Sequence, residues 1–251
     1  MNHQELRENW ERFAETDPLF AVISWPDKKG NRWNESEFFK NGADEIRTVM
    51  AYLDQLPVKV TRGRALDFGC GVGRLTQPLS ERFESVVGLD IAPRMIELAR
   101  HYNRHPRSCE YVLNPGEDLR LFPDASFDFI YSNITLQHMG PHYALAYIRE
   151  FVRVLRPGGL VLFQIPALYR PQTFHGKTRA LLKRMTPGFL DGAWKSFQRA
   201  ILRRAVVEMN PIPREKVLQV LEKSGAQVVE VVEDPNAGPE WLGYRYCVRK
   251  P

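Results

Sequence analysis

The chain has 251 residues, of which 43% are hydrophobic and 26% charged, with three cysteines and a formal net charge of +5. These values fit one globular domain and exclude a disordered chain, a collagen-like repeat and a disulfide-bonded miniprotein. No run reaches the ~18 apolar residues of a membrane helix, and the first residues lack signal-peptide character, so we expect a cytoplasmic protein with reduced thiols.

The first part of the chain is expected to form an N-terminal helical cover over residues 1–60. Between residues 38 and 53 the apolar side chains recur mostly at spacings of three and four, which is typical of one buried helical stripe. Pro57 is expected to end this helix.

Residues 61–166 alternate short apolar runs with helical segments and are predicted to form a ligand-binding core. The strands are expected at 65–68, 85–89, 109–113, 127–131 and 160–165. Such alternation indicates βαβ units, and right-handed crossovers then give a parallel sheet with helices on both faces. Ligands of such sheets bind outside the carboxyl ends of the strands. The site is therefore expected just after residues 67, 89, 113 and 131.

Residues 167–213 interrupt this pattern and are predicted to be a basic, amphipathic helical insert, with nine basic and two acidic residues. The apolar side of its stretch from Trp194 to Met209 needs a burial partner. A lid over the acceptor, a homodimer interface and a membrane surface all remain open; the lid is favoured, since the insert leaves from the ligand edge. Residues 214–251 predict a terminal helix and an antiparallel hairpin.

One stretch between a strand and a helix carries most of the chemical information. It contains Asp67, Gly69, Gly71 and Gly73. Glycine tolerates unusual dihedral angles and lets a ligand approach the backbone closely. Asp90 ends the next apolar run, where an acid can accept both hydroxyls of a ribose. Arg74 stands where a pyrophosphate fingerprint needs its third glycine, and Asp67 would repel phosphates, so the pattern favours a nucleoside bearing an amino acid over a dinucleotide.

With the strand at 127–129 and the turn at 154–159, this motif resembles the class I S-adenosylmethionine-dependent methyltransferases. The resemblance implies an α/β, Rossmann-like, mostly parallel seven-stranded sheet with helices on both faces and a reversed last strand. It also implies S-adenosyl-L-methionine as the cofactor and S-adenosyl-L-homocysteine as its product. The implied cofactor-binding residues are Asp67, Gly69, Cys70, Gly71, Gly73, Asp90, Ile91, Glu117, Asp118, Leu119, Ser132 and Asn133.

The resemblance also assigns parts of the donor to parts of the chain. Asp67 and the backbone of the first two glycines would lie near the methionine part, Asp90 would hold the ribose, and Ile91 would flank the adenine. The segment 117–119 would reach the adenine edge. Structural alternatives stay open: the glycines could form a simple turn, Asp90 could cap the helix near residue 93, and Asp118 could be a solvated turn acid.

His138 is the candidate catalytic residue, because it follows the fourth strand, where this fold places groups that face the transferred methyl. An imidazole with an unperturbed pKa near 6.5 suits general-base catalysis at neutral pH, and local packing is an equally weighted alternative. The chain lacks the Asn/Asp-Pro-Pro-aromatic tetrad of enzymes that methylate amines of nucleic-acid bases. No cluster with metal-ligand spacing stands out, so a metal-dependent mechanism is disfavoured.

Together these features predict a methyltransferase that transfers a methyl group to a small-molecule acceptor by in-line displacement. The first alternative is an RNA or other nucleic-acid methyltransferase whose phosphate contacts come from the basic insert. A second is a catalytically silent donor-binding subunit that regulates a partner. The acceptor itself is not identified, because acceptor pockets are built from variable loops.

Overall fold

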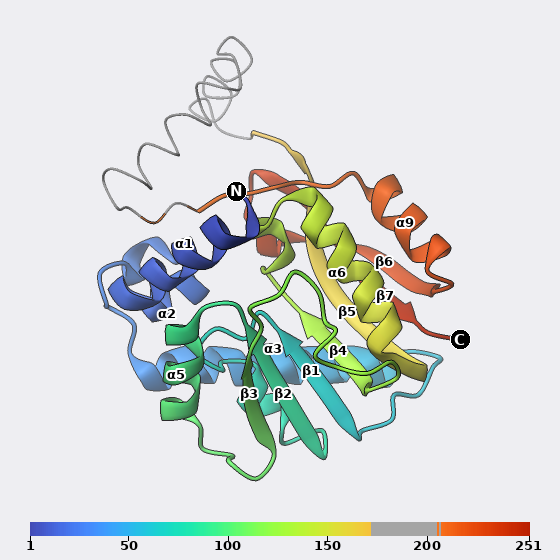
Figure 1. Cartoon of the computed structure of the whole chain (residues 1–251), viewed down its shortest axis with the longest axis horizontal. Helices are drawn as coiled ribbons and strands as arrows, with labels where there is room; N and C mark the ends of the chain where they lie inside the picture. Colours follow the sequence, from blue (N-terminus) through green and yellow to red (C-terminus); the bar gives the residue numbers. More distant parts are fainter. Residues whose placement is uncertain (172–204, 206) are drawn as a thin grey trace.

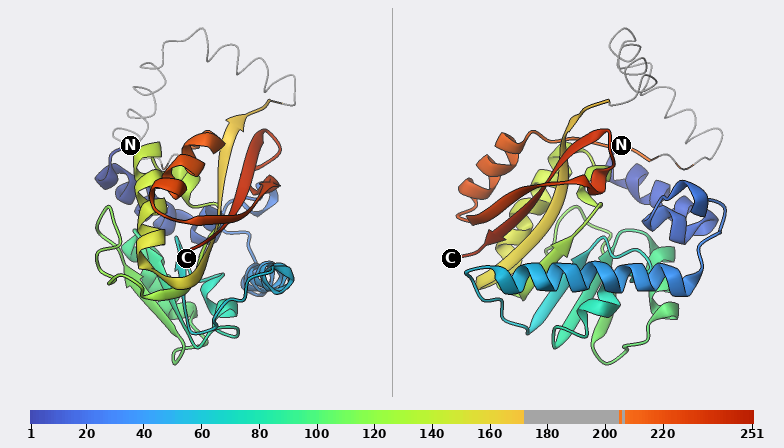
Figure 2. Two further views of the ribbon diagram at one scale, coloured as in Figure 1. Left: turned by 90° about the vertical axis from the view of Figure 1, so that its right-hand side faces the viewer. Right: turned by 180° about the vertical axis from the view of Figure 1, so that it is seen from behind.

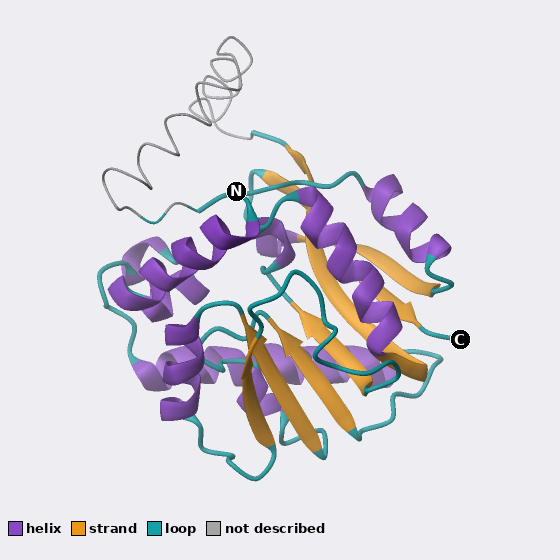
Figure 3. Cartoon of the chain, viewed as in Figure 1, coloured by secondary structure: helices purple, strands orange, loops and turns teal. Residues whose placement is uncertain are grey.

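The computed structural model describes residues 1–171, 205 and 207–251 and shows one sheet flanked by helices (Figures 1 and 3). The strand order is β3-β2-β1-β4-β5-β7-β6. The strands are β1 Arg64–Phe68, β2 Ser85–Asp90, β3 Cys109–Leu113, β4 Phe127–Ser132, β5 Leu155–Tyr169, β6 Gln227–Asp234 and β7 Trp241–Arg249. Strands β1 to β5 pair in parallel, whereas β7 runs antiparallel to both neighbours. The predicted mostly parallel sheet with a reversed last strand is confirmed.

Helices cover both faces of this sheet. They are α1 His3–Thr16, α2 Pro18–Val22, α3 Glu35–Gln55, α4 Thr76–Leu79, α5 Pro93–Tyr102, α6 Pro141–Val154 and α9 Arg214–Lys223, with short 3-10 turns η1 Pro26–Lys28, η2 Leu136–His138 and η3 Pro235–Ala237. Buried side chains of α6 and α9 share one apolar cluster with the strands, and those of α3 and α4 share another on the opposite face. Helix α3 runs across its face of the sheet, as seen from behind in Figure 2.

The long helix α3 forms where the apolar periodicity predicts one. Asn34 caps its start by accepting a hydrogen bond from the Glu37 backbone N–H, and Ile46, Val49 and Leu53 are buried on one side. The helix ends at Gln55, two residues before Pro57, because the residue that precedes a proline disfavours the helical conformation.

Strand β5 is longer than the sequence pattern indicates. It was expected to end at residue 165, with the insert starting at 167, but it continues to Tyr169, which pairs with Trp241 of β7. Hydrogen bonding to β7 extends the strand, and this partner lies over seventy residues away in sequence. Most of the predicted insert, residues 172–204 and 206, lies outside the described residues. The choice between a lid, a homodimer interface and a membrane surface therefore stays a prediction.

Two general features of the described part of the chain bear on its setting. No helix there is long and apolar enough to cross a membrane. Cys70, Cys109 and Cys247 are all buried and unpaired with one another. Within the same residues, no three or more His, Cys, Asp or Glu side chains gather in a way that could hold a metal ion.

Candidate functional site

A cavity lies at the carboxyl ends of β1, β2 and β4, the edge at which the sequence places the site. It encloses about 950 Å³ of empty space, including its opening to solvent. Its walls come from the loop after β1, the end of β2, the segment after β4, and helices α1, α2 and α6.

The glycine loop after β1 forms one wall. Gly69, Gly71 and Gly73 have φ angles of 79°, 52° and 85°, a left-handed region that favours glycine. The backbone N–H groups of Gly69 and Cys70 both donate to the Leu89 carbonyl, at 2.8 and 3.0 Å, which ties the loop to β2. Gly69, Cys70 and Gly71 line the cavity, whereas Gly73 does not.

Asp90 also lines the cavity and holds the loop in place. Its Oδ2 accepts a hydrogen bond from the Gly71 N–H and its Oδ1 one from the Ala92 N–H, both at 2.9 Å. Ala92 is the N-cap residue of α5, and no side chain caps that helix, so Asp90 binds the residue before the helix and the capping alternative is wrong. Each carboxylate oxygen can accept a second hydrogen bond, so these two bonds leave room for a ligand hydroxyl. Ile91, the next residue, lines the cavity too.

Asp67 lies differently from what the sequence leads us to expect. It is 2% exposed and is not among the residues that line the cavity. Thr76, the first residue of α4, donates its hydroxyl hydrogen bond to Asp67 Oδ2 at 2.7 Å. Burial raises the pKa of Asp67 to about 7, although this hydrogen bond and the charge of Arg74 act against the shift. The side chain of Asp67 therefore faces α4 rather than a ligand.

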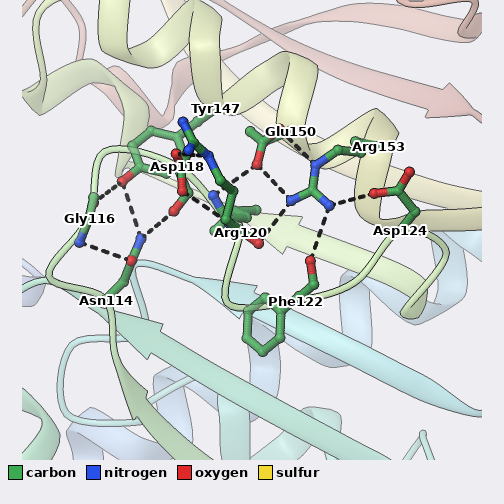
Figure 4. Close-up of polar contacts among 10 residues, drawn as sticks. Asn114, Gly116, Asp118, Arg120, Phe122, Asp124, Tyr147, Glu150 and Arg153 are labelled. Carbon is green, nitrogen blue, oxygen red and sulfur yellow. Dashed lines mark hydrogen bonds and ion pairs between the residues drawn. The ribbon is translucent and has the colours of Figure 1, made fainter.

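The expected adenine-edge segment does not reach the cavity either. Its polar contacts go to neighbouring residues of the loop and of α6 instead (Figure 4). Both oxygens of Asp118 are engaged by Arg120, one by its backbone N–H at 3.0 Å and one by its Nε at 2.7 Å. Leu119 is fully buried in the core, and its backbone N–H donates to Glu150 Oε2 at 2.9 Å. Glu117 is contacted only weakly, by the Tyr143 hydroxyl at 3.5 Å.

Asn114 is the residue after β3 that lines the cavity instead. It follows directly after β3, it is 5% exposed, and it lines the cavity. Its Nδ2 donates to the Asp118 carbonyl at 3.0 Å and its Oδ1 accepts from the Gly116 N–H at 3.2 Å. No sequence motif marks Asn114, and its position immediately after the third strand is the one signal that points to it.

The segment after β4 closes the opposite side of the cavity. Ser132 is fully buried, donates to the Phe68 carbonyl at 3.2 Å and does not line the cavity, whereas Asn133 does. Ile134 also lines it, with φ at 49°. A β-branched residue rarely adopts this conformation, and such strained residues cluster at functional sites.

A buried polar network links this segment to α3 and the glycine loop. Glu45 of α3 pairs through Oε2 with Arg74 at 2.8 Å, and its Oε1 accepts from the Tyr131 hydroxyl and from Asn133 Nδ2, both at 2.8 Å. Arg74 is 2% exposed and also donates to Asn41 at 2.9 Å. The residue that replaces the third glycine of a pyrophosphate fingerprint is thus the anchor between α3 and the loop.

His138 lines the cavity and is held as a neutral imidazole. Its Nδ1 lies 2.8 Å from the Glu208 carbonyl, which can only accept, so Nδ1 carries the hydrogen and Nε2 the lone pair. The His138 Nε2 lies 3.2 Å from the side-chain nitrogen of Gln137, an atom that can only donate a hydrogen bond. Burial lowers the pKa of His138, and the ring lies edge-on to Trp10 with centroids 5.2 Å apart.

Comparisons with known proteins agree with this geometry. A family model described as a methyltransferase domain matches residues 66–163, which include the glycine loop and the ends of β2 and β4. The chain is 31% identical over 182 residues to the biotin biosynthesis bifunctional protein BioHC of Cellvibrio japonicus, covering 72% of this chain and 31% of that protein. The chain carries a class I S-adenosylmethionine-dependent methyltransferase domain.

A further relative and a solved structure are also similar to this chain. A trans-aconitate 2-methyltransferase of Azoarcus sp. is 30% identical over 159 residues, covering 62% of this chain and 57% of that protein. The chain thus covers about a third of the length of BioHC and somewhat over half of the length of this trans-aconitate methyltransferase. A solved S-adenosylmethionine-dependent methyltransferase of Leishmania major superposes with a TM-score of 0.64 at 14% identity, covering 98% of this chain and 83% of that one, which shows the shared fold.

The cavity fits the donor that the methyltransferase domain uses. A hypothetical Cβ on Gly71 would lie 2.6 Å from Val22 Cγ2, so the loop needs glycine to pass beneath α2 and keep its backbone at the cavity wall. Asp90 supplies a carboxylate at the same wall. The remaining lining is largely apolar and aromatic, including Phe68 and Trp10, which suits a nucleoside and a sulfonium cation.

Proposed function

We propose that the protein transfers the methyl group of S-adenosyl-L-methionine to a small-molecule acceptor and releases S-adenosyl-L-homocysteine. The observation that carries this proposal is the Asp90 carboxylate, held at the cavity wall by the N–H groups of Gly71 and Ala92. The similarity to a trans-aconitate methyltransferase supports a small acceptor. We place the protein in the cytoplasm. We do not propose a nucleic-acid partner, because the excess of basic residues is confined to residues 167–213 and does not extend over the whole chain, and because the chain lacks the base-methylation tetrad.

The lining residues divide the donor site by chemistry. Asp90 would accept hydrogen bonds from the ribose hydroxyls, and Ile91 would pack against the adenine, with Asn114 as the polar group nearest its edge. The backbone of Gly69 and Gly71 would pass along the methionine part. Cys70, the remaining loop residue, is a buried thiol whose pKa is raised well above its usual value, so it serves as an uncharged wall and not as a nucleophile.

Other residues of the predicted donor site do not line the cavity and would instead hold the loop and strands that do. Asp67 would act through its bond to Thr76, by fixing the start of α4 against the end of β1. Gly73 is needed where the loop passes the Tyr111 hydroxyl. Ser132 joins β4 to β1 below Asn133. A direct contact of Asp118 with adenine would first require the loss of its ion pair with Arg120.

Methyl transfer from a sulfonium demands little from acid–base groups and much from positioning. The donor supplies an activated methyl group: its carbon–sulfur bond breaks as the bond to the acceptor forms, and sulfur keeps the electron pair. Holding the two reactants in line contributes roughly 7–11 kcal/mol in the best intramolecular cases. The left-handed Ile134 and the anchored Asn133 are rigid groups at the edge of the cavity that can provide this positioning.

His138 would accept the proton when the acceptor atom carries one. Its neutral state at pH 7 and the lone pair on Nε2 are the properties that a general base needs. The Gln137 amide now faces Nε2, so an acceptor hydroxyl would take the place of that contact. An acceptor that is a carbon or an ionised oxygen would need no base, and His138 would then serve only in packing against Trp10.

The test begins with calorimetric titration of the full chain with S-adenosyl-L-homocysteine, for which we expect one binding site per chain. Release of the same product is then measured from S-adenosyl-L-methionine with a panel of small hydroxy, amino and carboxylic acids. Absence of donor binding would refute the proposal. Donor binding without turnover would favour the regulatory subunit, and turnover only with RNA, with steep salt dependence, would favour the nucleic-acid alternative.

A further inference from the structure

A second cavity adjoins the first on the side of the sheet covered by α3. It lies between α3, the carboxyl ends of β4 and β5, and the β6–β7 hairpin, and encloses about 550 Å³ of empty space, including any part open to solvent. Asn133 lines both cavities. Asn133 is therefore a wall residue shared by the two cavities.

The floor of this cavity is a row of polar side chains on neighbouring strands. Gln164 of β5 and Arg245 of β7 are directly opposite each other in the antiparallel register, so both point to the same face. Ser132 pairs with Phe163, which places Asn133 at the level of Gln164. One step back along the same face, the side chains are largely apolar: Tyr131, Leu162 and Cys247 belong to the cluster packed under α3.

Gln164 is the unusual member of this row. Its side chain is only 2% exposed, yet neither its Oε1 nor its Nε2 has a hydrogen-bond partner among the described residues. The same holds for Nε of Arg245. Buried polar atoms without partners are costly and uncommon in folded proteins. A ligand that donates to and accepts from the Gln164 amide would remove this cost.

Gly243 packs close to this buried amide. A Cβ at position 243 would lie 3.2 Å from Gln164 Nε2 and still closer, at 2.7 Å, to the Asp234 carbonyl. A side chain there would crowd the amide that otherwise faces the cavity.

Charges around the cavity are balanced. Glu45 is neutralised by its ion pair with Arg74. Asp234 is 7% exposed and accepts from the Asn236 N–H at 2.9 Å. Burial raises the pKa of Asp234, and the positive charge of Arg245 acts against this shift. An anionic ligand group would face Glu45 and Asp234, and a cationic one would face Arg245, so an uncharged polar group fits best.

We propose that this second cavity binds an uncharged hydrogen-bonding group of the methyl acceptor, a carboxamide or a hydroxyl, with Gln164 and Arg245 as its partners and Asn133 at the passage to the donor. The assignment of this ligand to the acceptor rests on the proposed methyltransferase function. Gln164 is thus a binding and specificity residue, and the methylated atom belongs to the part of the acceptor that lies beyond Asn133.

The test uses the full chain saturated with S-adenosyl-L-homocysteine and four small probes: acetamide, 1,2-ethanediol, acetate and methylammonium. Saturation-transfer NMR reports their binding to wild type, to Gln164→Leu and to a matched control, Gln55→Leu, at an exposed position near the end of α3. We expect acetamide and 1,2-ethanediol to bind wild type and the control, and to bind Gln164→Leu about tenfold more weakly, the loss that one or two neutral hydrogen bonds supply. Acetate and methylammonium should not bind at this site.

Stability provides an independent readout. Leucine of similar size removes the unpartnered amide, so Gln164→Leu should unfold at the same or a higher temperature than wild type. Gln164→Met provides the same test if the leucine variant does not fold. Equal binding of acetamide to Gln164→Leu, binding of the charged probes instead, or no probe binding to wild type would each overturn the proposal. Donor affinity is measured separately on each variant, so failure of the methyltransferase function is distinguished from failure of the second cavity.

Discussion

Replacing Asp90 by alanine tests the donor site most directly. The carboxylate receives two backbone hydrogen bonds, from Gly71 and Ala92, at 2.9 Å each. With the donor bound it would also accept from the ribose hydroxyls. A hydrogen bond to a charged group contributes about 1.5–3 kcal/mol. Asp90→Ala should therefore weaken S-adenosyl-L-homocysteine binding by roughly 10- to 150-fold, since each 1.4 kcal/mol is tenfold in Kd.

Calorimetry on purified variants measures this loss, with Asp27→Ala as a control at an exposed position in η1. The chain should stay folded, because Gly69 and Cys70 still bind the Leu89 carbonyl and tie the loop to β2. Circular dichroism checks that condition. A Kd within twofold of wild type for a folded Asp90→Ala would refute the assignment, and would leave Asp90 only as an anchor that ties the glycine loop to the residue before α5.

Three further predictions concern the loop, the buried acid and the base. Gly71→Val should abolish donor binding and lower the melting temperature, since a side chain there meets Val22; calorimetric binding of wild-type strength would contradict this. The pKa of Asp67 rises from 3.8 to about 7 on folding, so its stabilising contribution is complete below about pH 4 and is lost as pH rises towards 7. Asp67→Asn should remove this pH dependence of the free energy of unfolding, which amounts to up to about 4 kcal/mol and is measured by urea unfolding at several pH values. A pH profile unchanged by the substitution would show that folding does not raise the pKa of Asp67. His138→Ala should lower kcat by about 10²–10⁴ with unchanged donor affinity; a loss below roughly tenfold on the true acceptor would indicate a packing role.

Local sequence patterns determined the architecture of this protein. Apolar runs of strand length, helical spacing from Phe38 to Leu53 and the glycines from Gly69 to Gly73 each depend on residues close together in the chain. Such patterns encode burial and backbone conformation directly. Because parallel strands bring their carboxyl ends to one edge, the same patterns also located the cavity and placed Asp90 in its wall.

Which side chains face the cavity was decided by contacts that form on folding. Asp67 and Asp118 occupy suitable sequence positions, but Thr76 at the start of α4 holds the first elsewhere, and Arg120, only two residues along the chain, holds the second. The length of β5 depends on its pairing with β7, over seventy residues later in the chain.

The polar groups at the centre of the molecule also come together only on folding. Glu45 reaches Arg74 because α3 packs across the sheet, and Gln164 lies opposite Arg245 because the last strand is reversed. In the sequence no neighbouring residue marks the partner that each of them meets on folding. Burial is what makes an unpartnered amide costly, and burial is a property of the folded chain alone.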